Sequence, residues 1–360
     1  MSLPEKRTYV EQVADHLRRQ ILSGTWQTVL PSERELAGHL QAARNTIRSA
    51  IQLLADEGLI HVQDGRRRHY ICRPDPSTKA PTAPRLSRAI LLTNAPISAL
   101  TSHTLLRLDL IRGMLSGSGI DLHVLSSRAF KMERPAVTLQ ELTDAHPNSL
   151  WILHHSTEPM QRWFLSQKIP CLTWGSAFPG ISLPGLAFDL AASMRHCMGV
   201  LKAQGHTSVA FVEPRHLLAG QRAARGVMEE PSHRWARVRS LVWDGNYALF
   251  PKTVNKLMQQ PRPPTAFIVT QCRHILVLYS TFCHLGIQVP GDVSIVALFD
   301  DPQMSHIVPP LSCYRENAEM ESRRMATLIR QAMRGFFPQR FTTLLQEYAP
   351  GHSIARPRPP

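Results

Sequence analysis

The 360-residue sequence contains no run of about 18 apolar residues, the length that a membrane-spanning helix needs. Its first residues, MSLPEKRTYVEQ, lack the apolar segment of a secretory signal peptide. From these absences we expect neither a helical membrane span nor a secretory leader. We therefore expect a cytoplasmic protein.

Motifs of the common catalytic and metal-binding families are also missing. The sequence has no Cys-x-x-Cys, Gly-x-Ser-x-Gly, Gly-x-Gly-x-x-Gly or P-loop. His154 and His155 end an expected strand, where successive side chains point to opposite faces, so they cannot chelate one ion together. Cys272 and His274 lack a second ligand pair at zinc spacing. We expect free thiols, no metal, no cofactor and no catalytic residues, and hence not an enzyme.

The charge is strongly basic, with a formal net charge of +14, which favours an acidic polymer as a partner. Its distribution does not locate the binding site, because residues 1–75 hold 11 Lys and Arg against 9 Asp and Glu. The excess over the rest of the chain is most simply a solvated surface. Nucleic-acid binding by that surface is kept as an alternative.

One stretch, residues 30–71, has the pattern of a helix-turn-helix. Ser32 and Glu35 have the spacing of a capping box at the start of a short helix. Residues 41–43 form a tight break, and a second helix follows from Arg44. Its apolar residues recur at helical spacing, at Ile47, Ala50, Ile51 and Leu54. The opposite face carries arginines at its N-terminal end, where such helices read base edges.

A β-hairpin is predicted after these helices. The segments 59–62 and 67–71 flank Asp64-Gly65, which is a hairpin signal. The tip of this wing carries Arg66, Arg67 and Arg68, and arginines there can neutralise phosphates or enter a minor groove.

Residues of this stretch resemble the DNA-binding domain of the GntR family over about 65 positions. The matches are Leu30-Pro31-Ser32-Glu33-Arg34-Glu35-Leu36-Ala37, Arg44 and Arg48, Leu53-Leu54-x-x-Glu57-Gly58-Leu59-Ile60, and Gly65. The resemblance implies DNA contacts by Arg34, Arg44 and Arg48 and a minor-groove approach by Gly65. Asn45 and Thr46 lie on the same turn and are further candidates, as are Arg66 and Arg67 on the wing. Ala43 departs from the usual Ser or Thr helix cap, at a cost of about 1 kcal/mol.

The next segment, residues 73–88, holds four prolines among Ser, Thr and Lys and is typical of an interdomain linker. We divide the chain into a DNA-binding domain (1–74), a linker (75–88), a large domain (89–348) and a Pro/Arg-rich tail (349–360). In the large domain, short apolar strands alternate with amphipathic helices. This alternation predicts a doubly wound, parallel α/β sheet.

Four segments of the large domain resemble the sensor domain of the lactose-repressor family, which is related to periplasmic sugar-binding proteins. They are Ile169-Pro170-Cys171-Leu172 with Phe188-Asp189, residues 201–211, residues 286–297, and Phe299-Asp300-Asp301 with Pro309-Pro310-Leu311-Ser312. The resemblance implies two α/β lobes around a ligand cleft, and a homodimer. The predicted fold is therefore an N-terminal winged helix-turn-helix joined to a two-lobed, periplasmic-binding-protein-like sensor, as in arabinose-responsive repressors.

The resemblance also suggests effector-binding residues. Arg222 and Asp300 are the nearest matches to an arginine and an aspartate that face the cleft, and such a pair can hold vicinal hydroxyls through charge-assisted hydrogen bonds. Arg225 and Asp301 compete for these roles, and a lobe-to-lobe salt bridge is the alternative use. The loop 271–273, Gln-Cys-Arg, replaces the Asn-Asp of the family.

From the sequence we predict a transcriptional regulator, by resemblance a repressor, that binds a pseudo-palindromic double-stranded DNA site as a homodimer. A small effector, with a sugar favoured, controls its DNA affinity. The alternative is a constitutive DNA-binding dimer whose sensor has lost ligand binding. A sugar-processing enzyme with an accessory DNA-binding domain is disfavoured because no catalytic constellation is present.

Overall fold

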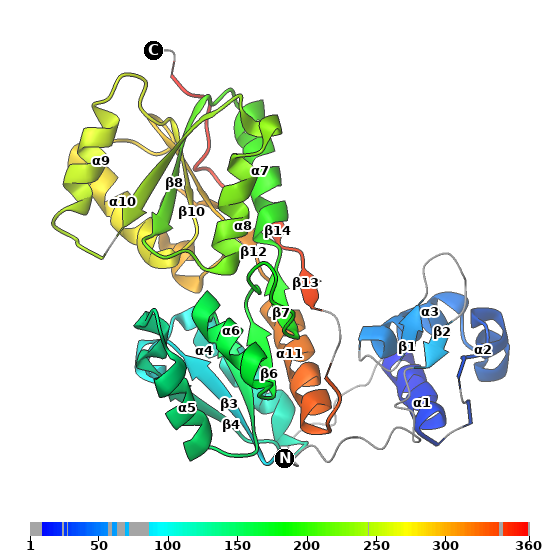
Figure 1. The fold of residues 1–360 in the computed structure, drawn as a ribbon. Helices are drawn as coiled ribbons and strands as arrows, with labels where there is room; N and C mark the ends of the chain where they lie inside the picture. The colour runs from blue at the N-terminus through cyan, green and yellow to red at the C-terminus, as the bar shows by residue number, and fades with distance from the viewer. Residues whose placement is uncertain are drawn as a thin grey trace, which may run out of the picture. The chain divides into compact units, whose positions relative to one another are not determined.

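The chain divides into two compact units, residues 1–83 and 84–360 (Figure 1). The computed structural model describes residues 9–23, 25–26, 28–56, 60–62, 69–71, 86–243, 245–337 and 341–358. Within these ranges, no helix is long and apolar enough to span a lipid bilayer.

Among its described residues, the small unit has three helices and a two-stranded antiparallel sheet. The elements are α1 (Tyr9–Ser23), α2 (Glu33–Leu40), α3 (Arg44–Asp56), β1 (Ile60–Val62) and β2 (His69–Ile71). The predicted capping box is confirmed: the Ser32 backbone N–H donates to Glu35 Oε2 (2.8 Å), and the Glu35 N–H donates to Ser32 Oγ. Gln41 ends α2 in the left-handed conformation (φ +48°), which makes the tight break between α2 and α3.

Apolar side chains from all three helices and both strands form one core in this unit, with Trp26 packed against it. Its buried members include Leu17, Ile21, Leu36, Ile47, Ile51, Leu54, Ile60 and Ile71. The register pairs Ile60 with Ile71, and Leu30 donates its N–H to the His69 carbonyl, so the hairpin is tied to the entry of α2. The wing tip, residues 63–68, lies outside the described residues.

The large unit contains two α/β lobes. The first lobe has a parallel sheet of order β13-β7-β6-β5-β3-β4. Its core is built on both faces, with α4 and α11 on one side and α5 and α6 on the other. The elements are β3 (Arg88–Thr93), η1 (Ile97–Ala99), α4 (Ser102–Ser116), β4 (Leu122–Ser126), η2 (Arg128–Lys131), α5 (Ala136–Ala145), β5 (Ser149–His154), α6 (Glu158–Gln167), β6 (Cys171–Trp174), β7 (Gly185–Phe188), α11 (Ala318–Met333) and β13 (Thr342–Leu344).

The second lobe has a sheet of order β14-β12-β11-β10-β8-β9, in which only β14 is antiparallel to its neighbour. Helices α9 and α10 cover one face, and α7 and α8 cover the other. The elements are α7 (Leu190–Ala203), β8 (Ser208–Pro214), α8 (Ala219–Met228), η3 (Pro231–His233), β9 (Arg237–Trp243), α9 (Phe250–Met258), β10 (Ala266–Val269), α10 (Cys272–Leu285), β11 (Ser294–Ala297), η4 (Pro302–His306), β12 (Ser312–Arg315) and β14 (Glu347–Ala349).

The inner strands β5, β6, β10 and β11 expose none of their residues, which explains why they read as continuous apolar runs, whereas the outer strands β4 and β9 are partly exposed. The predicted doubly wound α/β architecture is confirmed. Three crossovers join the lobes, from β7 to α7, from β12 to α11 and from β13 to β14. They leave the carboxyl ends of β7, β12 and β13, so the carboxyl ends of the two sheets face the hinge.

Residues 350–358, for which composition predicts only a Pro/Arg-rich tail, pack along the second lobe. Ser353 is fully buried, and its hydroxyl donates to the Ile295 carbonyl (2.6 Å) while accepting from the Ser312 N–H (2.9 Å). Arg358 forms an ion pair with Asp292 (2.6 Å). The segment therefore packs at the amino ends of β11 and β12 instead of extending into solvent.

Candidate nucleic-acid interface and interlobe cleft

The α2–α3 pair separates a buried face from a basic exposed one. Ile47, Ala50, Ile51 and Leu54 of α3 are all buried. Arg34, Arg44, Asn45 and Arg48 are exposed, and Thr46 is half-buried. Arg44 and Arg48 lie one helical turn apart at the start of α3, so both guanidinium groups are available on one surface.

An ion pair that the sequence analysis missed holds Arg48. Its Nη2 lies 2.8 Å from Glu33 Oε2, and its Nε donates to Glu33 Oε1 at 3.3 Å. This hydrogen bond and the charge of Glu33 raise the pKa of Arg48. The Arg48 side chain remains 65% exposed, so Glu33 orients the guanidinium without covering it. Glu33 also opens α2, where a carboxylate is favoured by the helix dipole.

The remaining predicted DNA contacts, Gly65, Arg66 and Arg67, lie outside the described residues. Their roles stay predictions.

In the large unit, Arg222 reaches from one lobe to the other. It lies in the first turn of α8, its Nη1 is 3.0 Å from Glu158 Oε2 on α6, and its Cζ lies 4.9 Å from the centre of the Phe178 ring. The lobes approach closely here, because a Cβ added at Gly220 would lie 2.9 Å from Ser176 Oγ. The salt bridge considered as an alternative use of Arg222 is therefore present.

The rival arginine, Arg225, is engaged within the second lobe. Its Nη1 contacts the buried Glu213 (3.1 Å), and its Nε lies 3.6 Å from Glu229. Asp300 follows β11 and is half-buried, whereas Asp301 is buried. Burial, followed by the charge of Asp301, raises the pKa of the Cys272 thiol to about 11. Because Asp300 is half-buried and Asp301 is buried, Asp300 is the more accessible of the two carboxylates.

A buried polar network lies at the hinge, and sequence reasoning did not find it. Glu316, between β12 and α11, accepts from His103 Nε2 (2.7 Å) and Arg107 Nη2 (3.1 Å) of α4. Arg107 also donates through its Nε to Glu321, which accepts from Trp174 Nε1 at 2.7 Å. The only local signal was an arginine, Arg107, on an apolar helix.

Gln346 connects this network to the other crossovers. Its Nε2 donates to Glu316 Oε1 (2.9 Å) and to the Leu298 carbonyl (3.1 Å), while Ser193 Oγ donates to its Oε1 (2.5 Å). Ser193 follows the first crossover, Glu316 lies in the second and Gln346 in the third. All three connections between the lobes therefore meet through one amide side chain.

Burial and neighbouring charges separate the two carboxylates of the network. Burial opposes ionisation of Glu316, but the His103 hydrogen bond and the Arg107 charge outweigh it and lower the pKa. Burial and the nearby Glu316 charge raise the pKa of Glu321. Burial lowers the pKa of His155, at the end of β5, to about 4. At neutral pH the hinge therefore pairs an ionised Glu316 with Arg107, beside a neutral His155.

Comparison with protein families identifies two domains. Residues 9–69 match the bacterial regulatory proteins of the gntR family, and residues 198–354 match the periplasmic binding protein-like domain. No curated protein matches the chain.

Solved structures share the fold of the large unit. A LacI family transcriptional regulator from Bifidobacterium animalis has a TM-score of 0.64 at 20% identity, over 76% of this chain and 100% of that one. A LacI family regulator from Enterococcus faecalis, with bound ribose, has a TM-score of 0.61 at 15% identity over 76% and 100%. A probable maltose operon repressor from Staphylococcus aureus has a TM-score of 0.64 at 14% identity over 75% and 99%.

Buried histidines predict loss of stability in acid. Burial lowers the pKa of His274 from 6.5 to about 4 and lowers that of His154 well below 6.5. Below pH 6.5 the unfolded chain takes up protons that the folded chain excludes, so the free energy of unfolding falls from pH 6.5 to 4. Each histidine contributes at most about 1.4 kcal/mol per pH unit.

Urea unfolding monitored between pH 7.5 and 4 measures this slope. His274→Asn should flatten it, whereas the same change at the exposed His284 of the same helix should not. A slope that is unaltered in the His274 variant would contradict the assignment.

Proposed function

We propose that this transcriptional regulator, which joins a gntR-family DNA-binding domain to a periplasmic binding protein-like domain, binds a pseudo-palindromic DNA site as a homodimer and responds to a small effector. DNA is read by α3 and the wing, through Arg34, Arg44, Asn45, Thr46, Arg48, Gly65, Arg66 and Arg67. The effector, for which we favour a carbohydrate, binds between the lobes with Arg222 and Asp300 among its contacts. The regulator acts as a repressor in the cytoplasm.

The observation that carries the proposal is the exposed arginine face on a rigid helix pair. Arg44 and Arg48 stand on a helix whose opposite face is fully packed, and Glu33 fixes one of them before DNA arrives. A guanidinium held in one orientation loses less entropy when it binds guanine or phosphate bidentately. The ion pair with Glu33 uses only some of the five N–H donors of the Arg48 guanidinium, so the remaining N–H groups face outward.

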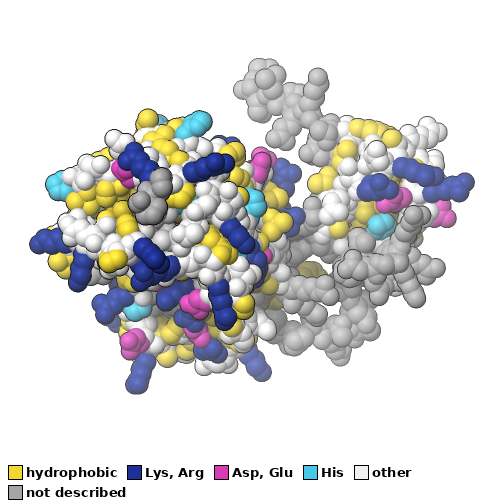
Figure 2. Space-filling model, turned by 90° about the horizontal axis from the view of Figure 1, so that it is seen from above, with side chains coloured by type: hydrophobic (Ala, Val, Ile, Leu, Met, Phe, Trp, Pro, Cys, Tyr) yellow, Lys and Arg dark blue, Asp and Glu magenta, His cyan; other side chains and the backbone are white. Residues whose placement is uncertain are grey.

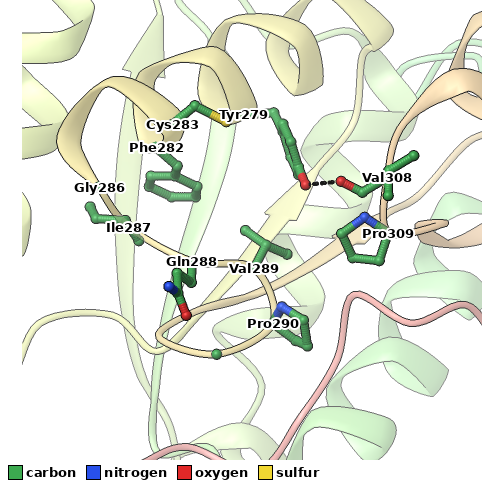
Figure 3. Close-up of a pocket in the computed structure, with 11 residues that line it drawn as sticks. Tyr279, Phe282, Cys283, Gly286, Ile287, Gln288, Val289, Pro290, Val308 and Pro309 are labelled. Atoms are coloured by element: carbon green, nitrogen blue, oxygen red, sulfur yellow. Dashed lines mark hydrogen bonds between the residues drawn. The ribbon is translucent and has the colours of Figure 1, made fainter.

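An apolar groove on the second lobe supports the homodimer. Figure 3 shows Tyr279 and Phe282 of α10 facing Val289, Pro290, Val308 and Pro309, with the Tyr279 hydroxyl donating to the Val308 carbonyl. The groove holds about 720 Å³, and Val308 is 80% exposed at its rim. Leu276 on α10 is 44% exposed. A second copy that covers this surface would bury apolar area on both chains, as a two-fold interface requires.

Support for the effector comes from the fold and the polar hinge. A similar fold with 15% identity holds ribose, and this chain offers charged side chains at the carboxyl ends of both sheets. A ligand that bridges Arg222 and the first lobe favours one lobe arrangement, and through it one spacing of the DNA-binding domains. Such coupling is worth typically about 1–3 kcal/mol.

The Arg222–Glu158 pair favours the second candidate, a constitutive regulator. It joins the lobes without a ligand, and the loop 271–273 lacks the Asn-Asp expected of a sugar site. In this form the sensor serves as a dimerisation domain alone.

Loss of a reading arginine should reduce specific DNA binding. We expect Arg48→Ala to weaken binding to the selected site by about 1–3 kcal/mol and to relax the choice at one base pair, because a bidentate base contact is removed. Binding-site selection followed by fluorescence anisotropy measures both effects. Arg19→Ala, at an exposed arginine on α1, is the control, and equal losses in both variants would refute the reading role.

Disruption of the apolar groove should produce monomers. Val308→Glu introduces a charge into the proposed interface and should shift the protein toward a monomer in sedimentation velocity experiments at micromolar concentration. Val137→Glu, at a 69% exposed valine on α5, is the matched control and should leave the dimer intact. An unchanged dimer in Val308→Glu would exclude this surface.

A sugar effector should stabilise the wild-type protein and not Arg222→Ala. At a ligand concentration 100 times Kd, stabilisation is about 2.7 kcal/mol, and a thermal-shift screen of pentoses and hexoses detects it. Glu158→Gln breaks the interlobe pair but leaves Arg222 available, so it should keep the ligand response. If no sugar stabilises either protein, the constitutive candidate is favoured instead.

A further inference from the structure

The end of the second lobe that lies opposite the hinge carries a dense group of arginines. The segments 204–208, 234–239, 260–265, 291–294 and 355–358 precede the strands β8, β9, β10 and β11 or lie beside them, and we call their common surface the distal face. Because these strands are parallel, their amino ends meet at one edge of the sheet. The arginines are Arg234, Arg237, Arg239, Arg262, Arg356 and Arg358.

The same segments contain one carboxylate, Asp292, and it is paired with Arg358. Two further carboxylates near this edge, Glu229 and Glu230, contact Arg225 and Arg195. Five arginines of the distal face therefore have no carboxylate partner among the described residues. Figure 2, which looks onto this end of the large unit, shows many dark blue side chains and few magenta ones.

Arg239 provides a second observation. Its Nη1 donates to the buried Ser208 Oγ (2.9 Å), so its side chain turns toward the start of β8, and its buried Nη2 has no hydrogen-bond partner. Burial, with the neighbouring charge of Arg237, lowers the pKa of Arg239. A buried guanidinium N–H without an acceptor is costly, and the half-buried Arg239 side chain keeps its charge near the surface, where a nearby anion would stabilise it.

From this geometry we propose that the distal face binds the phosphate backbone of duplex DNA, as a contact separate from the α2–α3 reading face. Neighbouring strands lie about 4.8 Å apart, so the four strand ends span about 15 Å. Duplex DNA presents one negative charge per about 1.7 Å, and that length offers several phosphates to the planar guanidinium groups.

The composition of the distal face favours a polyanion over an apolar protein surface. None of the large exposed hydrophobic residues of the described chain falls within the five segments. Protein interfaces concentrate aromatic and aliphatic anchors at their centre, whereas phosphate contacts need only donors and charge. The contact carries no base-specific group, so it adds affinity for all sequences equally.

The distal face lies far from the point at which the chain enters the large unit. The chain enters this unit at residues 86–88, which begin β3 at the amino edge of the first sheet. The carboxyl ends of both sheets face the hinge, so the amino edges point away from each other. The distal face and the chain entry therefore lie at opposite ends of the unit.

The test uses the full chain with Arg34, Arg44 and Arg48 all changed to alanine, so that contacts from the reading face are removed. In this background we compare Arg234→Ala, Arg237→Ala and Arg262→Ala together against Lys131→Ala, Arg134→Ala and Lys168→Ala together. All six side chains are exposed, and both triple variants lose the same charge. Arg239 and Arg358 are retained because they make contacts within the fold.

Fluorescence anisotropy with a random-sequence duplex at several salt concentrations is the measurement. Each phosphate contact contributes about 0.9 to the slope of log K against log salt, so the distal variant should have a slope shallower by about 2 to 3. The control variant should retain the parent slope, and both should keep the parent unfolding midpoint. Equal slopes in the two variants would overturn the proposal.

Polyglutamate serves as a second probe. If it binds the parent but not the distal variant, while DNA binding is the same in both, the face binds an acidic polypeptide and the DNA assignment is wrong. A wrong assignment of the reading face would be recognised separately. The variant in which Arg34, Arg44 and Arg48 are changed to alanine would then still bind its specific DNA site.

Discussion

The two lobes of the large unit meet around one buried carboxylate, Glu316, and the amide of Gln346 that contacts it. Removing a charge from water is expensive unless hydrogen bonds replace the lost hydration, and here His103, Arg107 and Gln346 supply them. Two of these partners belong to α4 of the first lobe, whereas Gln346 lies in a crossover and also donates to the Leu298 carbonyl of the second lobe. A change in lobe angle would therefore act on this network first through Gln346.

Local patterns in the sequence were sufficient for the α2–α3 pair and for the alternation of strands and helices, but they did not predict β12 or β14. The spacing of apolar residues in α3, the Ser32–Glu35 cap and the continuous apolar runs of the inner strands act within a few residues, so they can be read without the fold. The alternation of strand and helix then restricts the sheet to a parallel one. The separation of Arg44 and Arg48 from Ile47 and Ile51 followed from helical periodicity alone.

Contacts between distant residues could not be read in this way. Glu33 and Arg48 are 15 residues apart, and Arg107 and Glu316 are separated by 209. Nothing local marks Glu316 as buried, because a glutamate after a strand is ordinarily solvated. Ser353 lies in a segment with the composition of a Pro/Arg-rich tail, yet its hydroxyl contacts both β11 and β12. These partners are chosen by the packing of the lobes, which depends on the whole chain.

The ion pair between Arg222 and Glu158 joins the two lobes, but its effect on them depends on its free energy. Arg222 is 53% exposed and Glu158 28% exposed, so solvent screens the pair and its net contribution is about 0–1 kcal/mol. Such a contribution biases the lobes toward closure without locking them. An effector that binds Arg222 must break the ion pair with Glu158, at a free-energy cost of about 0–1 kcal/mol. This cost is smaller than the about 1–3 kcal/mol typical of allosteric coupling. We therefore infer that the ion pair is compatible with ligand control, and that a constitutive sensor would require the hinge network around Glu316 to resist rearrangement.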